Sequence, residues 1–155
     1  MAKKHPDAVI QNRRVRYDYD LRDEFSVGIV LSGQEVKAAR GGQVSLKGSY
    51  VTLKDGELWL INASFSVLHS KPGTSERTVE TGARKLLAKK KEITALAEAK
   101  DQGLTIVPLS MTTRTRFIKL KIATAKGKKQ YDKRETIKRR DQERETKRLL
   151  AQKIN

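Results

Sequence analysis

The chain of 155 residues contains no cysteine and only two histidines. Without cysteine it can have no disulfide bond, no catalytic thiol and no zinc site with cysteine ligands. Neither His5 nor His69 has a second histidine at the spacing of a metal site. No apolar run approaches the roughly 20 residues of a transmembrane helix, and no signal-peptide pattern begins the sequence. We expect a cytoplasmic protein with no metal, no cofactor and no membrane partner.

The sequence also lacks the motifs of common enzymes. The glycine-rich phosphate loops, the zinc-protease motif and the nucleophile elbow are all absent. A nuclease could hold a divalent metal ion with four clustered carboxylates, Asp18, Asp20, Asp23 and Glu24. No second acidic cluster follows to complete a two-metal site, and a surface patch that balances nearby arginines is the simpler interpretation. We therefore expect a binding protein and not an enzyme.

Positive charge is what the sequence has in excess. Lysine and arginine number 34 against 18 aspartate and glutamate residues, which gives a net charge of +16. Such an excess is typical of proteins that bind nucleic acid or an anionic membrane surface. No basic helix with a rich apolar face is evident, so nucleic acid is the favoured partner.

The last thirty residues, 126–155, form a basic tail with twelve basic and five acidic residues, a net charge of +7. Its large apolar residues after Tyr131 are only Ile137, Leu149, Leu150 and Ile154. These are too few for a face that packs on a core. Asp132 as N-cap and Glu135 three residues later predict the start of a helix. Charge pairs stabilise a helix by only about 0.2–0.5 kcal/mol each, so we expect a tail that becomes helical when bound to a polyanionic surface.

Residues 1–125 are predicted to form one domain of short strands. Alternating apolar residues predict a strand at 25–31, and Asp55-Gly56 between two apolar runs predicts a β-hairpin. Other patterns predict extended segments at 44–53, 104–109 and 117–124, and helices at 34–40 and 90–102. Pro108 is expected at a sheet edge, and composition assigns 69–82 to a loop. About six strands with two or three helices predict a mainly β fold, a small Greek-key barrel like the OB-fold.

Several residues suit the recognition of RNA. Lys126, Lys128 and Lys129 surround Gly127, which lets the backbone approach a phosphate closely. Bases could stack on Tyr17, Tyr19, Tyr50 or Tyr131. By contrast, Trp59 in an apolar strand is expected in the core, and Lys119 and Lys121 on the wet face of a strand are expected only to aid solubility.

Six blocks of the sequence match, in order, the pattern of one family: 28–31 (GIVL), 33–40 (GQEVKAAR), 55–60 (DGELWL), 84–87 (RKLL), 103–109 (GLTIVPL) and 125–134 (AKGKKQYDKR). The chain resembles small protein B, the SsrA-binding protein that partners transfer-messenger RNA (tmRNA) in bacterial trans-translation. The resemblance extends over nearly the whole chain, and the last block is its most specific part.

This resemblance implies an OB-like barrel without catalytic activity, bound one per RNA to the tRNA-like domain of tmRNA. The basic tail would enter the empty mRNA channel of a stalled ribosome and become helical there. The implied RNA contacts are Asn12, Arg16, Glu35, Lys37, Arg40, Arg84, Lys85, Lys126, Lys128 and Lys129. Near the decoding centre the resemblance implies Tyr131, Asp132, Lys133 and Arg134, and farther along the channel Leu149 and Leu150.

Two alternatives remain open at this point. The first is another basic OB-fold protein, either a ribosomal protein or a translation factor, which would share the charge and the fold class. Residues 127–134 argue against it, because the resemblance is most specific there. The second, less favoured, is a metal-dependent nuclease that uses the acidic cluster at 18–24.

Overall fold

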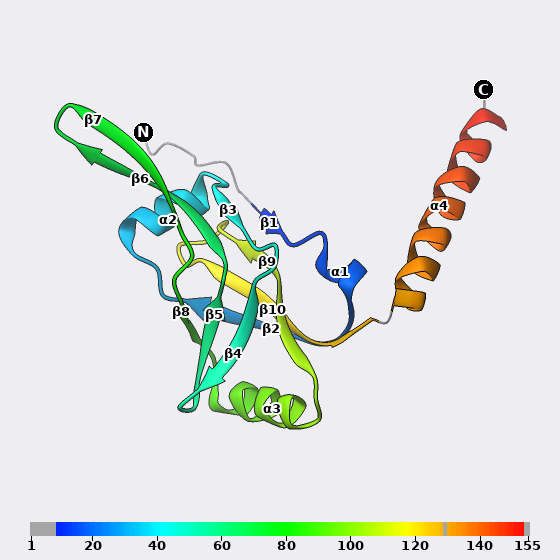
Figure 1. Ribbon diagram of the computed structural model, residues 1–155, viewed down its shortest axis with the longest axis horizontal. Coiled ribbons are helices and arrows are strands. Elements are labelled where there is room, and N and C mark those ends of the chain that lie inside the picture. Colours follow the sequence, from blue (N-terminus) through cyan, green and yellow to red (C-terminus); the bar gives the residue numbers. More distant parts are fainter. Residues whose placement is uncertain (1–8, 129, 154–155) are drawn as a thin grey trace.

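Strands account for most of the body of the molecule, and a long helix extends from it (Figure 1). The computed structural model describes residues 9–128 and 130–153, with the backbone alone at 130–132 and 153. In chain order the elements are β1 (Val9–Gln11), α1 (Val15–Asp18), β2 (Tyr19–Ile29), α2 (Gly33–Arg40), β3 (Val44–Ser45), β4 (Tyr50–Lys54), β5 (Glu57–Ile61), β6 (Ser64–Lys71), β7 (Thr74–Glu80), β8 (Arg84–Leu87), α3 (Lys90–Asp101), β9 (Thr105–Thr112), β10 (Lys119–Gly127) and α4 (Gln130–Lys153).

Six of the strands close into an antiparallel barrel. Their order is β9-β10-β2-β8-β5-β4, and the pairing of Val51 in β4 with Ile106 in β9 completes the circle. Strand β1 pairs with the end of β9, at Ser110 to Thr112, and β3, β6 and β7 form a separate small sheet. Closure gives every barrel strand two partners, which removes the exposed edges of an open sheet. The predicted mainly β barrel of about six strands is confirmed.

The barrel encloses one apolar core. Alternate residues of the strands point inward, among them Leu58, Leu60, Leu120 and Ile122, which are fully buried. Leu96 of α3 and Phe65 of β6 belong to the same cluster, and α3 lies across one end of the barrel (Figure 1). The period of two that predicted the strand of β10 is therefore the period of core contact, and β5 follows the same period.

The predicted hairpin at Asp55-Gly56 is present. Both residues have positive φ, 53° and 74°, which is the backbone of the tight turn that Asp-Gly favours. The hairpin sets the register of β4 against β5, so Leu58 and Leu60 face the core while Trp59 faces outward and is half-buried. The assignment of Trp59 to the core was wrong, because strand alternation places it on the other face from its buried neighbours.

The segment 69–82, predicted as a loop, contains much of a β-hairpin. β6 and β7 pair from Phe65↔Glu80 to Lys71↔Thr74, and the hairpin projects from the body in Figure 1. Every residue of β7 from Thr74 to Val79 is exposed, so neither face of the strand required apolar residues. A strand without a buried face carries no hydrophobic alternation, which is why composition alone misassigned it.

Pro108 was predicted to lie at a sheet edge. It lies instead within β9, a strand that has β1 on one side and β10 on the other. The register against β10 shifts at this point, from Lys121↔Ser110 to Ile122↔Pro108. Proline has no N–H to donate to a neighbouring strand, and a bulge is one of the places in a sheet that tolerates it. The proline therefore marks the bulge and not the edge.

The basic tail forms α4, which projects from the body (Figure 1). Its side chains from Ile137 to Gln152 are all exposed, as expected from the lack of an apolar face. The helix begins at Gln130, so Asp132 lies inside its first turn and is not the N-cap that was predicted. That the tail needs a bound surface to become helical stays a prediction, and so does the division into a domain at 1–125 and a tail at 126–155.

The outward position of Trp59 gives a direct test of the register. Leu60→Ala should lower the free energy of unfolding by about 2–5 kcal/mol, because Leu60 is 0% exposed in the core. Trp59→Ala should cost less than about 2 kcal/mol, since the ring is only half-buried on the outer face. Urea denaturation of both variants measures this, and an equal or larger loss for Trp59→Ala would contradict the register.

Candidate nucleic-acid interface

The four-residue helix α1 places basic side chains on the outside of the barrel. Its Val15 is buried against an outer apolar cluster, formed by Val107, Leu109, Ala123 and Ala125 of β9 and β10. With Val15 anchored, Arg14 and Arg16 on either side of it are exposed. A helix this short has no periodicity to detect, so sequence analysis found the arginines but not the element that holds them.

Asn12 holds the link between β1 and α1. Its side-chain nitrogen donates to the carbonyl oxygens of Leu46 at 3.2 Å and Pro108 at 3.1 Å, and its backbone N–H donates to Leu109 at 2.8 Å. This predicted RNA contact is therefore half-buried and also bonded within the protein. It lines a pocket of about 390 Å³ together with Arg13, Arg16 and Lys121.

Strand β10 carries a line of lysines along the same surface. Lys119 and Lys121 face outward and are exposed, as the alternation predicted. The Lys121 ammonium lies 2.7 Å from the carboxylate of Glu24. This hydrogen bond, aided by the charges of Lys121 and Arg16, holds the pKa of Glu24 below its usual value. Lys121 is thus part of a basic surface with Arg16, a role that sequence analysis did not give it.

The end of β10 joins α1 to α4. The backbone N–H of Lys128 donates to the Asp18 carbonyl at 3.0 Å, and its side chain donates to Arg16 O and Thr136 Oγ1, both at 3.1 Å. Asp18 also accepts from Arg14 at 3.3 Å and lies 3.4 Å from Lys133. One carboxylate and one lysine therefore connect the start of the exposed helix to the barrel.

Tyr17 has two cations near its ring at this junction. Arg14 Cζ and Lys133 Nζ are each 5.7 Å from the centre of its ring, and Arg134 lines the same pocket. The predicted residues Arg16, Lys128, Lys133 and Arg134 are thus brought together. Lys126 is exposed on β10 opposite Asp20. Lys129 and the side chains of Tyr131 and Asp132 lie outside the described residues.

Two other predicted contacts, Lys37 and Arg40, lie on α2. Ser32 and Glu35 form a capping box at its start, with Ser32 Oγ accepting from the Glu35 N–H at 3.3 Å. Arg40 at its end donates to the Arg116 carbonyl at 3.2 Å, and Lys37 lines a pocket beside the β6–β7 hairpin. These cations belong to a different part of the surface from the α1–α4 junction.

Arg84 is buried and does not face solvent, in contrast to its assignment as an RNA contact. It is 5% exposed, its Nη1 and Nη2 donate to the Ala63, Gly82 and Glu80 carbonyls, and Nη2 also lies 3.2 Å from the Glu35 carboxylate. The guanidinium carbon is 4.0 Å from the centre of the Phe65 ring. Arg84 therefore links β8 to α2. Glu35 binds and orients the Arg84 guanidinium and is not a free carboxylate on the surface.

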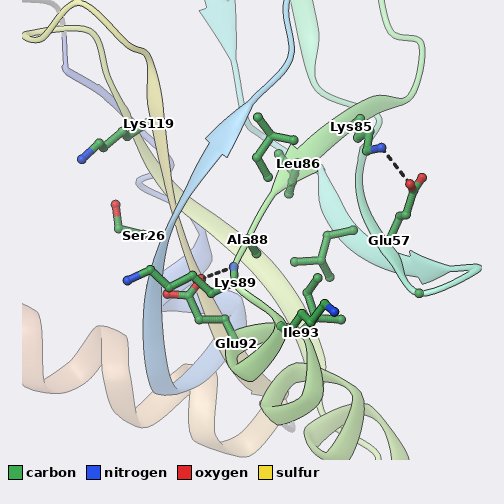
Figure 2. A pocket seen from close by; sticks show the side chains of 13 residues that line it. Ser26, Glu57, Lys85, Leu86, Ala88, Lys89, Glu92, Ile93 and Lys119 are labelled. Carbon is green, nitrogen blue, oxygen red and sulfur yellow. Dashed lines mark hydrogen bonds and ion pairs between the residues drawn. The ribbon is translucent and has the colours of Figure 1, made fainter.

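Lys85, the next residue, lies on a second basic surface beside α3. Its ammonium is 2.7 Å from Glu57, and both line a cleft of about 680 Å³ that also contains Lys89, Lys90 and Lys119. Figure 2 shows Lys85 turned toward Glu57, with Lys119 on the other side of the cleft. Lys119 lines this cleft and Lys121 the pocket at Arg16, so β10 runs between the two basic areas.

Leu149 and Leu150 lie near the far end of α4, where they are 56% and 57% exposed. Sixteen residues separate Leu149 from Lys133, which corresponds to about 24 Å along a helix. The structure does not bring this pair together with any of the predicted contacts on the body. Their exposure leaves both side chains free to meet a partner.

The acidic cluster does not form a metal centre in the described part of the chain. No three histidine, aspartate or glutamate side chains of residues 9–128 and 133–152 are grouped so that they could hold a metal ion. Asp18 and Glu24 are each in ion pairs with basic residues. None of the described helices is both long and apolar enough to span a membrane.

With this geometry the chain can be compared with known proteins. The family profile described as SmpB protein matches residues 9–152. The chain belongs to the SmpB family. SsrA-binding proteins of Streptococcus pyogenes and Streptococcus thermophilus are 45% and 42% identical, over 97% of this chain and 96% and 97% of theirs. The resemblance predicted from the sequence blocks is confirmed.

A solved structure is also similar to this chain. It is described as "tmRNA-SmpB: a journey to the center of the bacterial ribosome" and matches with a TM-score of 0.60 at 36% identity. The match covers 79% of this chain and 85% of that one. The SmpB family and its fold are therefore supported by sequence and structure alike.

The burial of Arg84 predicts that its main effect is on stability. Arg84→Met should cost about 3–5 kcal/mol, because it leaves the Glu35 carboxylate, whose side chain is 14% exposed, without its partner. Lys85→Met is the matched control in the same strand, and since its ion pair with Glu57 is well exposed it should cost less than about 1 kcal/mol. Thermal denaturation of both variants tests this; equal stability of the two would show that Arg84 has no structural role.

Proposed function

We propose that this chain is an RNA-binding protein that binds the tRNA-like domain of tmRNA and delivers it to stalled ribosomes for trans-translation. The observation that carries the proposal is the basic junction of α1, β10 and α4 in a member of the SmpB family. Arg16, Lys128 and Lys133 meet there, and Arg14 and Lys121 extend the surface on either side. Clustered cations of this kind bind phosphates, and a nearby aromatic ring suits an unpaired base.

The similar proteins support this partner. The relatives are named SsrA-binding proteins, and the similar solved structure is described by tmRNA, SmpB and the ribosome. The names of the family and of these relatives describe a binding protein and mention no catalysed reaction. We infer that the chain acts in the cytoplasm, without catalysis or cofactor, as a monomer bound one per RNA.

The body and the tail divide this work. None of the described residues of α4 belongs to either apolar cluster, so the barrel has a complete core of its own. We assign RNA binding to residues 1–125 with Lys126, Lys128 and Lys129, including Asn12, Arg16, Lys37, Arg40 and Lys85. In α4, Tyr131 to Arg134 would lie near the decoding centre, and Leu149 and Leu150 would lie farther along the mRNA channel.

The identity of the RNA that accompanies the protein in cells tests the function. A tagged full-length chain should co-purify with one discrete RNA of a few hundred nucleotides, whose sequence is that of tmRNA. Recovery of ribosomal RNA alone would indicate a different ribosomal protein or translation factor. Cleavage of labelled RNA by the pure protein with magnesium would favour a nuclease instead.

Removing the tail should leave most of the RNA affinity. A chain that ends at Gln130 keeps the net charge of +9 on residues 1–125 and three further lysines. Its affinity for a transcript of the tRNA-like domain should fall linearly with salt on logarithmic axes, by about 0.7–0.9 per phosphate contacted. Filter binding over a salt series measures the slope. Complete loss of specific affinity would refute the assignment of RNA binding to the body.

Breaking α4 should affect only the ribosome step. Arg140 lies in the middle of the helix, exposed and far from the junction, and a proline in a helix interior costs about 3 kcal/mol. Arg140→Pro should abolish tagging of stalled peptides in a reconstituted translation assay while affinity for the transcript stays near wild type. Arg140→Ala is the control for the lost charge. Normal tagging by the proline variant would mean that the helix is not required.

A further inference from the structure

The turn between β9 and β10, residues 113–118, carries the most exposed large apolar side chain among the described residues. Phe117 is 70% exposed. The turn that presents it is held on both sides, since Thr113 and Ile118 are buried. Thr115 Oγ1 donates to the Phe117 carbonyl at 2.7 Å, and Arg40 of α2 donates to the Arg116 carbonyl at 3.2 Å. The Phe117 ring is therefore exposed on a turn whose backbone is fixed by buried ends and hydrogen bonds.

Positive charge lies on the same turn as this ring. Arg114 and Arg116 both precede it in the turn, and Arg40 reaches the turn from α2. The guanidinium carbon of Arg116 is 5.8 Å from the ring centre. None of these three arginines takes part in the ion pairs found between described residues. Arginines that no described carboxylate pairs with, on the same turn as an exposed aromatic ring, suit a nucleotide, whose base has a flat face and whose phosphates are negative.

We propose that Phe117 is a stacking platform for an unpaired base of the bound RNA, and that Arg40, Arg114 and Arg116 contact the phosphates on either side of that base. This inference rests on the proposed function and adds a stacking contact beside Arg40, which that function already assigns to the RNA. The eight steps of β10 from Lys119 to Gly127 correspond to about 26 Å, so the platform lies at the opposite end of the strand from the α1–α4 junction.

An apolar pocket of a protein partner fits the turn less well. The exposed residues before the ring, Arg114, Thr115 and Arg116, are polar, and the apolar residue after it, Ile118, is buried, so Phe117 is not the centre of an exposed apolar patch. Protein interfaces bury a contiguous apolar centre with few charges, and this turn offers the reverse. Because a phenyl ring stacks on any base, the platform should add affinity without choosing a sequence.

Substitutions at position 117 in the full-length chain test the proposal. Stacking on an aromatic ring is worth about 1–3 kcal/mol per base, which corresponds to about 5- to 150-fold in Kd. Phe117→Leu should weaken binding to a transcript of the tRNA-like domain within that range, with an unchanged salt slope because no charge is lost. Phe117→Trp should keep wild-type affinity, and its fluorescence should fall on addition of the transcript by more than that of the wild type, in which only Trp59 reports.

The matched control is Val79→Ala, which removes another exposed apolar side chain, on β7. Its affinity should equal that of the wild type, and melting temperatures should show that each variant is folded. If the wild type binds the transcript and Phe117→Leu binds it equally well, the platform is refuted while the proposed function stands. If the wild type itself does not bind the transcript, the proposed function fails and the platform fails with it.

Discussion

The pairing of β4 with β9 is the interaction on which the other features depend. It closes the barrel at Val51 and Ile106, two buried residues, and so completes both the sheet and the core within it. Because side chains on the inner faces of the barrel strands form the core, the outer faces of these strands can carry charged side chains and short helices. Val15 of α1 anchors on the outer side of β9 and β10, and Arg16 and Lys121 are displayed as a consequence.

Charge, and not apolar contact, connects the tail to this body. Lys128 and Lys133 reach Arg16 and Asp18, while the rest of α4 has no apolar face to pack. Exposed ion pairs contribute little to stability and weaken in salt, so the body sets the direction of the helix only loosely. A cationic helix held in this way can exchange Asp18 for RNA phosphates without disturbing the barrel.

Much of the fold could be predicted because its signals are local. Alternation in β10 and the Asp-Gly turn between β4 and β5 each depend on residues adjacent in sequence. The misassigned features depend on what lies across the fold. Arg84 resembles a surface cation until Glu35, from α2, is seen beside it, and Trp59 differs from Leu60 only in the face that the barrel gives it. Likewise β7 has no buried face to mark it, and α1 is too short to be periodic.

The central claim is that the barrel binds RNA by itself and that the tail acquires its partner only on the ribosome. Hydrogen exchange of the full chain, measured free, with the tRNA-like domain, and with that RNA on a stalled ribosome, tests it most directly. The account predicts that RNA alone slows exchange in α1 and β10, while amides 137–152 exchange fast until the ribosome is added. Protection of 137–152 by the RNA alone, or in the free protein, would contradict it.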